Sequence, residues 1–253
     1  MTVTIRRYRG IVSSDWSECL SPNGPFDPIA FTYPQLESEL SSIFREYTWN
    51  LISLAQATDA IRHLLPGPLA QDQMDAYLAA SFRTYSGVPA LIHWCLSHDL
   101  FFMINTTGMQ GYFQRVFARG LLPPVPVVAA NPMIQYPESV AQGIEFLSVT
   151  EIEDKPKNTQ AVMQARTVPP DKLVVIGDSG GDGPHFRWGA DSGGFLIGSM
   201  TKNSLESYCS NAGITLHARF GMRYGPGDPR DPEKEMQFDF MEMAELIRNA
   251  LGL

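Results

Sequence analysis

Residues 172–182 read KLVVIGDSGGD and join a short apolar run to carboxylates and glycines. The four apolar residues Leu173 to Ile176 predict a buried strand of a parallel sheet. Asp178 and Asp182 follow that strand, and open α/β sheets bind their ligands at the carboxyl ends of their strands. The stretch therefore predicts an α/β fold with a polar site at this edge of the sheet.

The letters GDSGG inside this stretch also surround the nucleophilic serine of chymotrypsin-like proteases. That chemistry needs a catalytic histidine, a buried aspartate and usually several disulfides. His63 and His93 lie in segments of helical pattern, and the chain is not a series of short alternating strands. We therefore disfavour the protease interpretation and expect Ser179 to be a bystander.

The composition is that of a globular protein with a sizeable core, with 253 residues, 44% hydrophobic and 18% charged. A net charge of −8 disfavours nucleic acid or an anionic membrane surface as the main partner. The three scattered cysteines indicate neither a zinc site nor a disulfide framework. Without a secretory signal or a long apolar run, the chain is interpreted as cytoplasmic.

Buried-type strands alternate with helical segments through most of the chain. Strands are expected over 4–14, 100–107, 125–132, 172–178 and 193–200, with an edge strand at 214–220. Helical periodicity covers 34–65, 69–85, 88–99, 109–120, 157–166, 183–192, 203–213 and 232–252. This pattern predicts a three-layer, Rossmann-like core with a mostly parallel sheet, formed by residues 1–21 and 87–253. The helical block 22–86 interrupts the alternation and is expected to be a small inserted cap.

The residues that follow the predicted strands have a chemistry in common. Clustered carboxylates repel one another unless a divalent cation neutralises them, and oxygen ligands favour Mg²⁺. A lysine and a hydroxyl beside that cation would hold a phosphoryl group, and an aspartate could accept it as an acyl phosphate. The residues expected at this edge are Asp15, Thr106, Thr107, Lys155, Lys157, Asp178 and Asp182.

This arrangement resembles the haloacid dehalogenase superfamily, in particular its phosphoserine-phosphatase-like branch with a helical cap. Four motifs stand in the order of that family, and the predicted cap lies between the first two. They are GIVSSDWSECL at 10–20, FFMINTTGM at 101–109, DKPKN at 154–158 and VVIGDSGGD at 174–182.

The resemblance implies a role for each matching position. Asp15 would be the nucleophile and a magnesium ligand, together with the backbone carbonyl of Ser17. Asp178 would be a second metal ligand, and Asp182 would support the metal site.

For the phosphoryl group, the resemblance implies hydrogen bonds from the hydroxyl of Thr106, with Thr107 beside it. Lys155 would neutralise the phosphoaspartate, and Lys157 is a close competitor for that role. The implied activity is Mg²⁺-dependent hydrolysis of a small phosphorylated metabolite.

The first motif departs from the family at its second aspartate, the general acid/base, where this chain has Ser17. Glu18 and Cys19 replace the Gly and Thr that normally follow. Loss of a general acid/base typically costs about 10²–10⁴-fold in rate. A slow phosphatase, a different reaction, and an impaired protein that binds a phosphorylated ligand or a protein partner all remain open. A second alignment, which makes Asp15 the second aspartate and places Ser13 at the nucleophile, also remains open.

Overall fold

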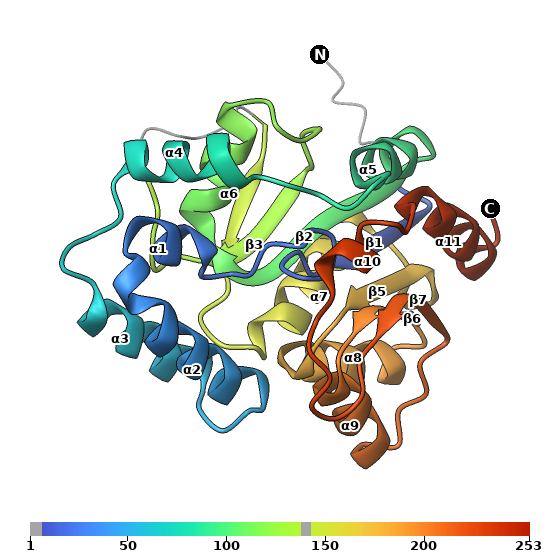
Figure 1. Cartoon of the computed structure of the whole chain (residues 1–253). Coiled ribbons are helices and arrows are strands. Elements are labelled where there is room, and N and C mark those ends of the chain that lie inside the picture. The colour runs from blue at the N-terminus through green and yellow to red at the C-terminus, as the bar shows by residue number, and fades with distance from the viewer. Residues whose placement is uncertain (1–6, 138–142) are drawn as a thin grey trace.

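The computed structural model describes residues 7–137 and 143–253, and the predicted strand residues 4–6 lie outside this part. Within it, seven strands form one parallel sheet in the order β4-β3-β2-β1-β5-β6-β7 (Figure 1). The strands are β1 (Gly10–Ser14), β2 (Leu100–Met109), β3 (Val127–Asn131), β4 (Glu145–Ser148), β5 (Leu173–Gly177), β6 (Phe195–Thr201) and β7 (Ala218–Arg223). The prediction of an α/β fold with a parallel sheet is confirmed.

The central strand β1 pairs with β2 on one side and with β5 on the other. Ser14, its last residue, lies opposite Ile104 of β2 and Ile176 of β5. The chain therefore leaves these three strands at the same edge of the sheet. Strand order reverses at β1, and such a reversal point is where open α/β sheets form a ligand crevice.

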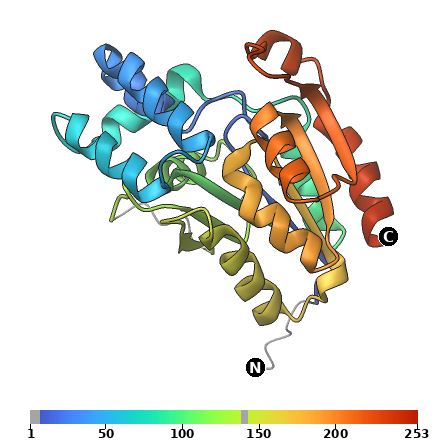
Figure 2. The ribbon, with the colours of Figure 1, turned by 90° about the horizontal axis from the view of Figure 1, so that it is seen from below.

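Helices cover both faces of the sheet, which gives the expected three layers (Figure 2). Alternate strand residues point to opposite faces, so Val12 and Phe102 enter one core, and Ile11 and Phe101 enter the other. On the first face lie α5 (Val88–Ser97), α6 (Gln110–Ala118) and α11 (Met243–Leu251). On the second face lie α7 (Asp154–Arg166), α8 (Gly183–Asp191) and α9 (Asn203–Asn211).

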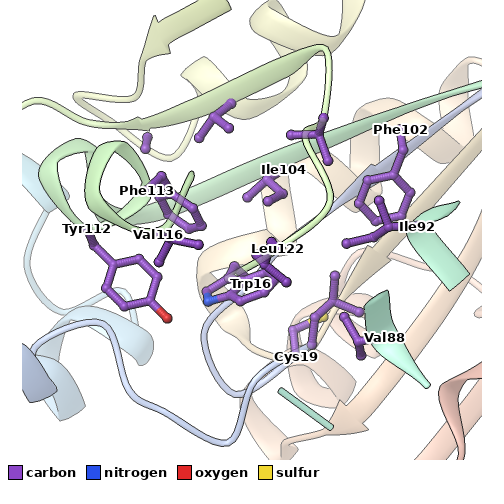
Figure 3. Close-up of a cluster of buried hydrophobic side chains, with 14 of the residues drawn as sticks. Trp16, Cys19, Val88, Ile92, Phe102, Ile104, Tyr112, Phe113, Val116 and Leu122 are labelled. Atoms are coloured by element: carbon purple, nitrogen blue, oxygen red, sulfur yellow. The ribbon is translucent and has the colours of Figure 1, made fainter. Parts of the chain in front are cut away.

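The turn after β1 is anchored in the first core. Trp16 and Cys19 are buried there, and the ring of Trp16 meets Phe113 of α6 edge to face at 5.7 Å (Figure 3). Because these side chains are fixed by packing, the backbone between them is held in place. Asp15 therefore leaves the sheet from a rigid position.

Four helices are inserted between β1 and α5, as the helical periodicity predicted. They are α1 (Asp27–Thr32), α2 (Glu37–Thr48), α3 (Leu54–Leu64) and α4 (Gln71–Ser81). The expected single helix over 34–65 is wrong, because Asn50 adopts a left-handed conformation and Ser53 starts α3 with a capping box to Gln56. Helix α4 packs against α1 and against α6 of the core.

Two further elements differ from the expectations. Strand β4 was not predicted, since its four residues are only partly buried at the edge of the sheet. The single helix expected over 232–252 is divided into α10 (Pro232–Glu235) and α11, because Asp239 caps a separate 3-10 turn between them. Among the described helices, none has both the length and the apolar character needed to cross a membrane.

Candidate active site

Lys155 lies at the centre of the polar cluster. It belongs to the first turn of α7, and its side chain is only 2% exposed. Its Nζ lies 3.0 Å from Asp15 Oδ1 and 2.6 Å from Asp182 Oδ1, so one ammonium joins two buried carboxylates. Asn105 of β2 fixes the helix start, since its Nδ2 donates to the backbone oxygen of Lys155 at 2.8 Å.

Lys157, the competing lysine, lies outside this cluster. Its side chain is 70% exposed and pairs with Asp154 on the surface. The two lysines are two residues apart on a helix, so they point to different sides of α7. The structure thus brings Lys155, and not Lys157, to the site.

Three carboxylates gather at the edge of the sheet, as predicted. Asp15, Asp178 and Asp182 are buried, and each has an atom within 4.8 Å of the others. The backbone N–H of Asp178 donates to Asp182 Oδ2 at 2.9 Å, which orients the Asp182 carboxylate. Asp178 Oδ1 has no hydrogen-bond partner among the described residues.

Burial dominates the ionisation of these groups. It raises the pKa of Asp15, and Lys155 only partly opposes this effect. It raises the pKa of Asp178 well above the ordinary value, against the opposing charge of Lys202. Buried carboxylates with an unpartnered oxygen are hard ligands, and their mutual repulsion is relieved by a divalent cation. The donor set therefore fits Mg²⁺.

The two predicted threonines occupy different places. Thr106 is buried beside Asp15, where its hydroxyl favours the ionised carboxylate and accepts the N–H of Gly108 at 3.1 Å. Thr107 lines the cavity in front of the carboxylates. Of the two threonines, Thr107 lines the cavity and Thr106 contacts Asp15.

A small cavity, about large enough for a single water molecule, opens onto this cluster. From the sheet edge it is lined by Asp15, Ser17 and Asp178, with Lys155 and Lys202 beside them. The inserted helices cover it from the other side with Phe44, Tyr47 and Thr48. The site is thus built jointly by the sheet edge and the inserted block.

Ser13 and Asp15, the two residues considered for the nucleophile, lie in different surroundings. Ser13 lies inside β1, where its hydroxyl is 2.9 Å from the hydroxyl of Thr159. Asp15 lies beyond the strand and reaches the cluster. The polar cluster at the edge of the sheet therefore includes Asp15, whereas Ser13 is bonded inside the sheet.

Sequence reasoning missed Lys202, which follows β6 at the same edge of the sheet. Its Nζ lies 2.6 Å from Asp178 Oδ2, and it also pairs with Glu18. Arg230, from the loop between β7 and α10, holds the other oxygen of Glu18 and pairs with buried Glu235. Lys202 could have been considered for the site from its position shortly after a predicted strand.

Glu18 is an ionised group in this network. Burial by itself would raise its pKa, but Lys202 and Arg230 outweigh burial and hold the pKa below the ordinary value. Its backbone has φ 58°, in the left-handed region that favours the glycine expected at this position of the motif. The two ion pairs offset this backbone cost.

His185, three residues after Asp182 in the sequence, does not line the cavity. It is buried beneath Lys155, with Nε2 3.0 Å from the hydroxyl of Thr159, and its ring is stacked on Trp188. Burial, reinforced by the charge of Lys155, lowers its pKa to about 3. His185 is therefore a neutral core residue.

No family model and no curated protein matches this sequence. Among solved structures, the fold is similar to that of phosphoserine phosphatase in complex with a phospho-aspartyl intermediate analogue. The TM-score is 0.67 at 13% identity, over 95% of this chain and 99% of that chain. A substrate-bound phosphoserine phosphatase has a TM-score of 0.64 at 14% identity, over 94% and 97% of the two chains.

A HAD family hydrolase from Salmonella enterica serovar Typhi is similar at a TM-score of 0.62 and 14% identity, over 84% of this chain and 68% of that chain. The predicted resemblance to the haloacid dehalogenase superfamily is thereby confirmed at the level of the fold. The chain has the fold of phosphoserine phosphatases and HAD hydrolases.

Proposed function

We propose that the chain is a Mg²⁺-dependent phosphatase that hydrolyses a small phosphorylated metabolite through an aspartyl phosphate on Asp15. The observation that carries the proposal is the buried bridge from Lys155 to Asp15 and Asp182, at the strand-order reversal of a HAD-type fold. A carboxylate held there by a lysine and backed by further carboxylates suits phosphoryl transfer, which depends mainly on position and charge.

Asp15 performs the first step by attacking phosphorus, so that the Asp15–phosphorus bond forms and the bond to the leaving oxygen breaks. Water then attacks the aspartyl phosphate, releases inorganic phosphate and restores Asp15. Lys155 neutralises the charge that develops between Asp15 and the phosphoryl group, and the hydroxyl of Thr107 hydrogen-bonds a phosphoryl oxygen. These roles follow from burial and proximity to the cavity.

The carboxylates of Asp15 and Asp178, with the backbone carbonyl of Ser17, would hold the magnesium ion, and Asp182 would support them. Bound magnesium supplies positive charge that offsets the charge of the phosphoryl oxygens. The buried oxygen of Asp178 that lacks a partner supports this assignment.

Residues 22–86 are proposed to act as a cap over the core formed by 1–21 and 87–253. Helix α2 supplies Phe44, Tyr47 and Thr48 to the cavity wall, which supports a role in selecting the substrate.

Ser17 motivates a second candidate, an impaired protein that binds a phosphorylated ligand or a protein partner without turning over a substrate. A serine hydroxyl cannot serve as an acid/base near neutral pH. The first candidate turns over a substrate and the second does not, but both are expected to bind phosphate.

The test is a panel of phosphate esters assayed with MgCl₂ and with EDTA, for the wild type, Asp15→Asn and the matched exposed control Asp171→Asn. We expect Mg²⁺-dependent turnover by the wild type and by Asp171→Asn, and its loss in Asp15→Asn. Binding of inorganic phosphate without turnover would favour the second candidate. Absence of both turnover and phosphate binding would refute both.

A further inference from the structure

Tyr47 brings a hydroxyl from the inserted helices into the catalytic cavity. It lies in the last turn of α2, is 3% exposed, and lines the cavity together with Asp15 and Lys155. Among the described residues its hydroxyl has no well-aligned hydrogen-bond partner, although Thr107 lies near it. Buried hydroxyls are nearly always paired, so this one is poised for a group that the protein itself does not supply.

The fold makes room for this hydroxyl beside the fourth motif. A methyl group on Gly181 would lie 2.8 Å from the Tyr47 oxygen, closer than van der Waals contact allows. Gly181 stands between Asp178 and Asp182 in sequence, so the tyrosine reaches the loop that carries these carboxylates. The absence of a side chain at residue 181 is what admits the hydroxyl.

Other acidic or basic groups near the site are bound to other partners or do not line the cavity. Glu18 is held as an anion by Lys202 and Arg230, and it does not line the cavity. His185 is buried behind Lys155 and is neutral. Ser17 also lines the cavity, but its aliphatic hydroxyl is a weaker acid than the phenol of Tyr47.

We propose that Tyr47 is the proton donor to the leaving oxygen, the role that Ser17 cannot perform. The proposal rests on the proposed phosphatase function. As the Asp15–phosphorus bond forms, the bond from phosphorus to the leaving oxygen breaks, and that oxygen takes the proton of Tyr47. The tyrosinate then takes a proton from the water that attacks phosphorus, the phosphorus–Asp15 bond breaks, and Tyr47 is restored.

The electrostatics of the site agree with this cycle. The ammonium of Lys155 lies near the Tyr47 oxygen and would stabilise the tyrosinate between the two steps. Burial raises the pKa of Tyr47, so its hydroxyl can donate a proton only to a more basic oxygen, such as that of an alkoxide leaving group, and the tyrosinate is a strong base toward water. An alcohol product needs such a proton, whereas a good phenolate leaving group does not.

The test compares Tyr47→Phe with Tyr77→Phe on two phosphate esters of similar size: benzyl phosphate, whose leaving group is an alkoxide, and p-nitrophenyl phosphate, whose leaving group is a stable phenolate. Tyr77 is a matched control, because it is 2% exposed and its hydroxyl also lacks a partner among the described residues, but it does not line the cavity. The measured quantity is kcat/KM, which reports on the steps up to phosphorylation of Asp15.

For Tyr47→Phe we expect kcat/KM to fall about 10²-fold with benzyl phosphate and to change little with p-nitrophenyl phosphate, whose leaving group needs no proton. Tyr77→Phe should leave both values unchanged. Equal losses on both substrates, or no loss on either, would overturn the role of Tyr47. Absence of turnover of both esters by the wild type would instead contradict the phosphatase function itself.

Discussion

Lys155→Met removes the ammonium that joins Asp15 to Asp182 and keeps most of the side-chain length. The two contacts, at 3.0 Å and 2.6 Å, each correspond to about 5–6 kcal/mol at an effective dielectric constant of about 20, before desolvation is subtracted. Removing one partner of a buried pair typically costs about 3–5 kcal/mol of folding free energy. We expect a loss of that size at pH 8.

The loss should depend on pH in a defined direction. Without the lysine, the pKa of the Asp15 carboxyl in the folded variant lies further above its unfolded value, because burial and Asp182 are then unopposed by Lys155. A group with a raised folded pKa binds protons better when folded, so the variant regains stability as pH falls. The loss relative to the wild type should be smaller at pH 5 than at pH 8.

Lys157→Met is the matched control, because that lysine makes only an exposed ion pair with Asp154, typically worth about 0.3–0.5 kcal/mol. Urea unfolding of the wild type and both variants at pH 5 and pH 8 measures the free energies, and titration with inorganic phosphate measures ligand binding. Lys155→Met should also lose phosphate binding, and Lys157→Met should retain it. Equal effects of the two substitutions on stability and on binding would refute the assignment of Lys155.

Three further predictions concern the neighbouring groups. Ser17→Asp restores the family's acid, and turnover of benzyl phosphate should rise in the Tyr47→Phe background by up to about 10²-fold; no gain would contradict the alignment of the first motif. His185 binds protons only when unfolded, since its pKa falls from 6.5 to about 3 on folding. Stability should therefore decrease as pH falls from about 6.5 toward 3, by up to about 4–5 kcal/mol, and urea unfolding of His185→Gln should show a shallower decrease. Glu18→Gln removes the negative charge that pairs with Lys202 and Arg230. The free energy of unfolding in urea should fall by about 2 kcal/mol above pH 5 and by less near pH 3. The reason is that the lowered pKa of Glu18 stabilises the fold only where the carboxylate is ionised. An equal cost of Glu18→Gln at both pH values would show that its charge is not what stabilises the fold.

The core of the fold was predictable because its signals are local. Apolar runs such as Leu173–Gly177 and the polar residues that follow them indicate both the strand and the edge where the site lies. The breaks in the long helical segments were not predictable from periodicity, since apolar spacing continues across the gap that follows Thr48. Strand β4 carries little signal of its own, because only its pairing with β3 defines it.

The site was predicted in part for the same reason. Asp15, Lys155, Asp178 and Asp182 follow strands or begin a helix beside them, and they come together as expected. Lys202 was missed because a single lysine resembles any surface charge until its partner, 184 residues away in sequence, is known.

Tyr47 was likewise not predicted from the sequence as a residue of the site. It belongs to the apolar row of an amphipathic helix, where a tyrosine is expected to pack in a core. Only the docking of α2 over the sheet edge turns its hydroxyl toward the cavity. The relative placement of the inserted helices and the sheet edge is a tertiary property that spacing does not encode.

The central claim is that Asp15 carries the phosphoryl group during turnover. The direct measurement is an acid quench of the protein during steady-state hydrolysis of p-nitrophenyl phosphate with MgCl₂, followed by digestion and mass spectrometry. We predict one phosphoryl group on the peptide that contains Asp15, and none in Asp15→Asn treated in the same way. Phosphorylation at another residue, or continued turnover by Asp15→Asn, would contradict the claim.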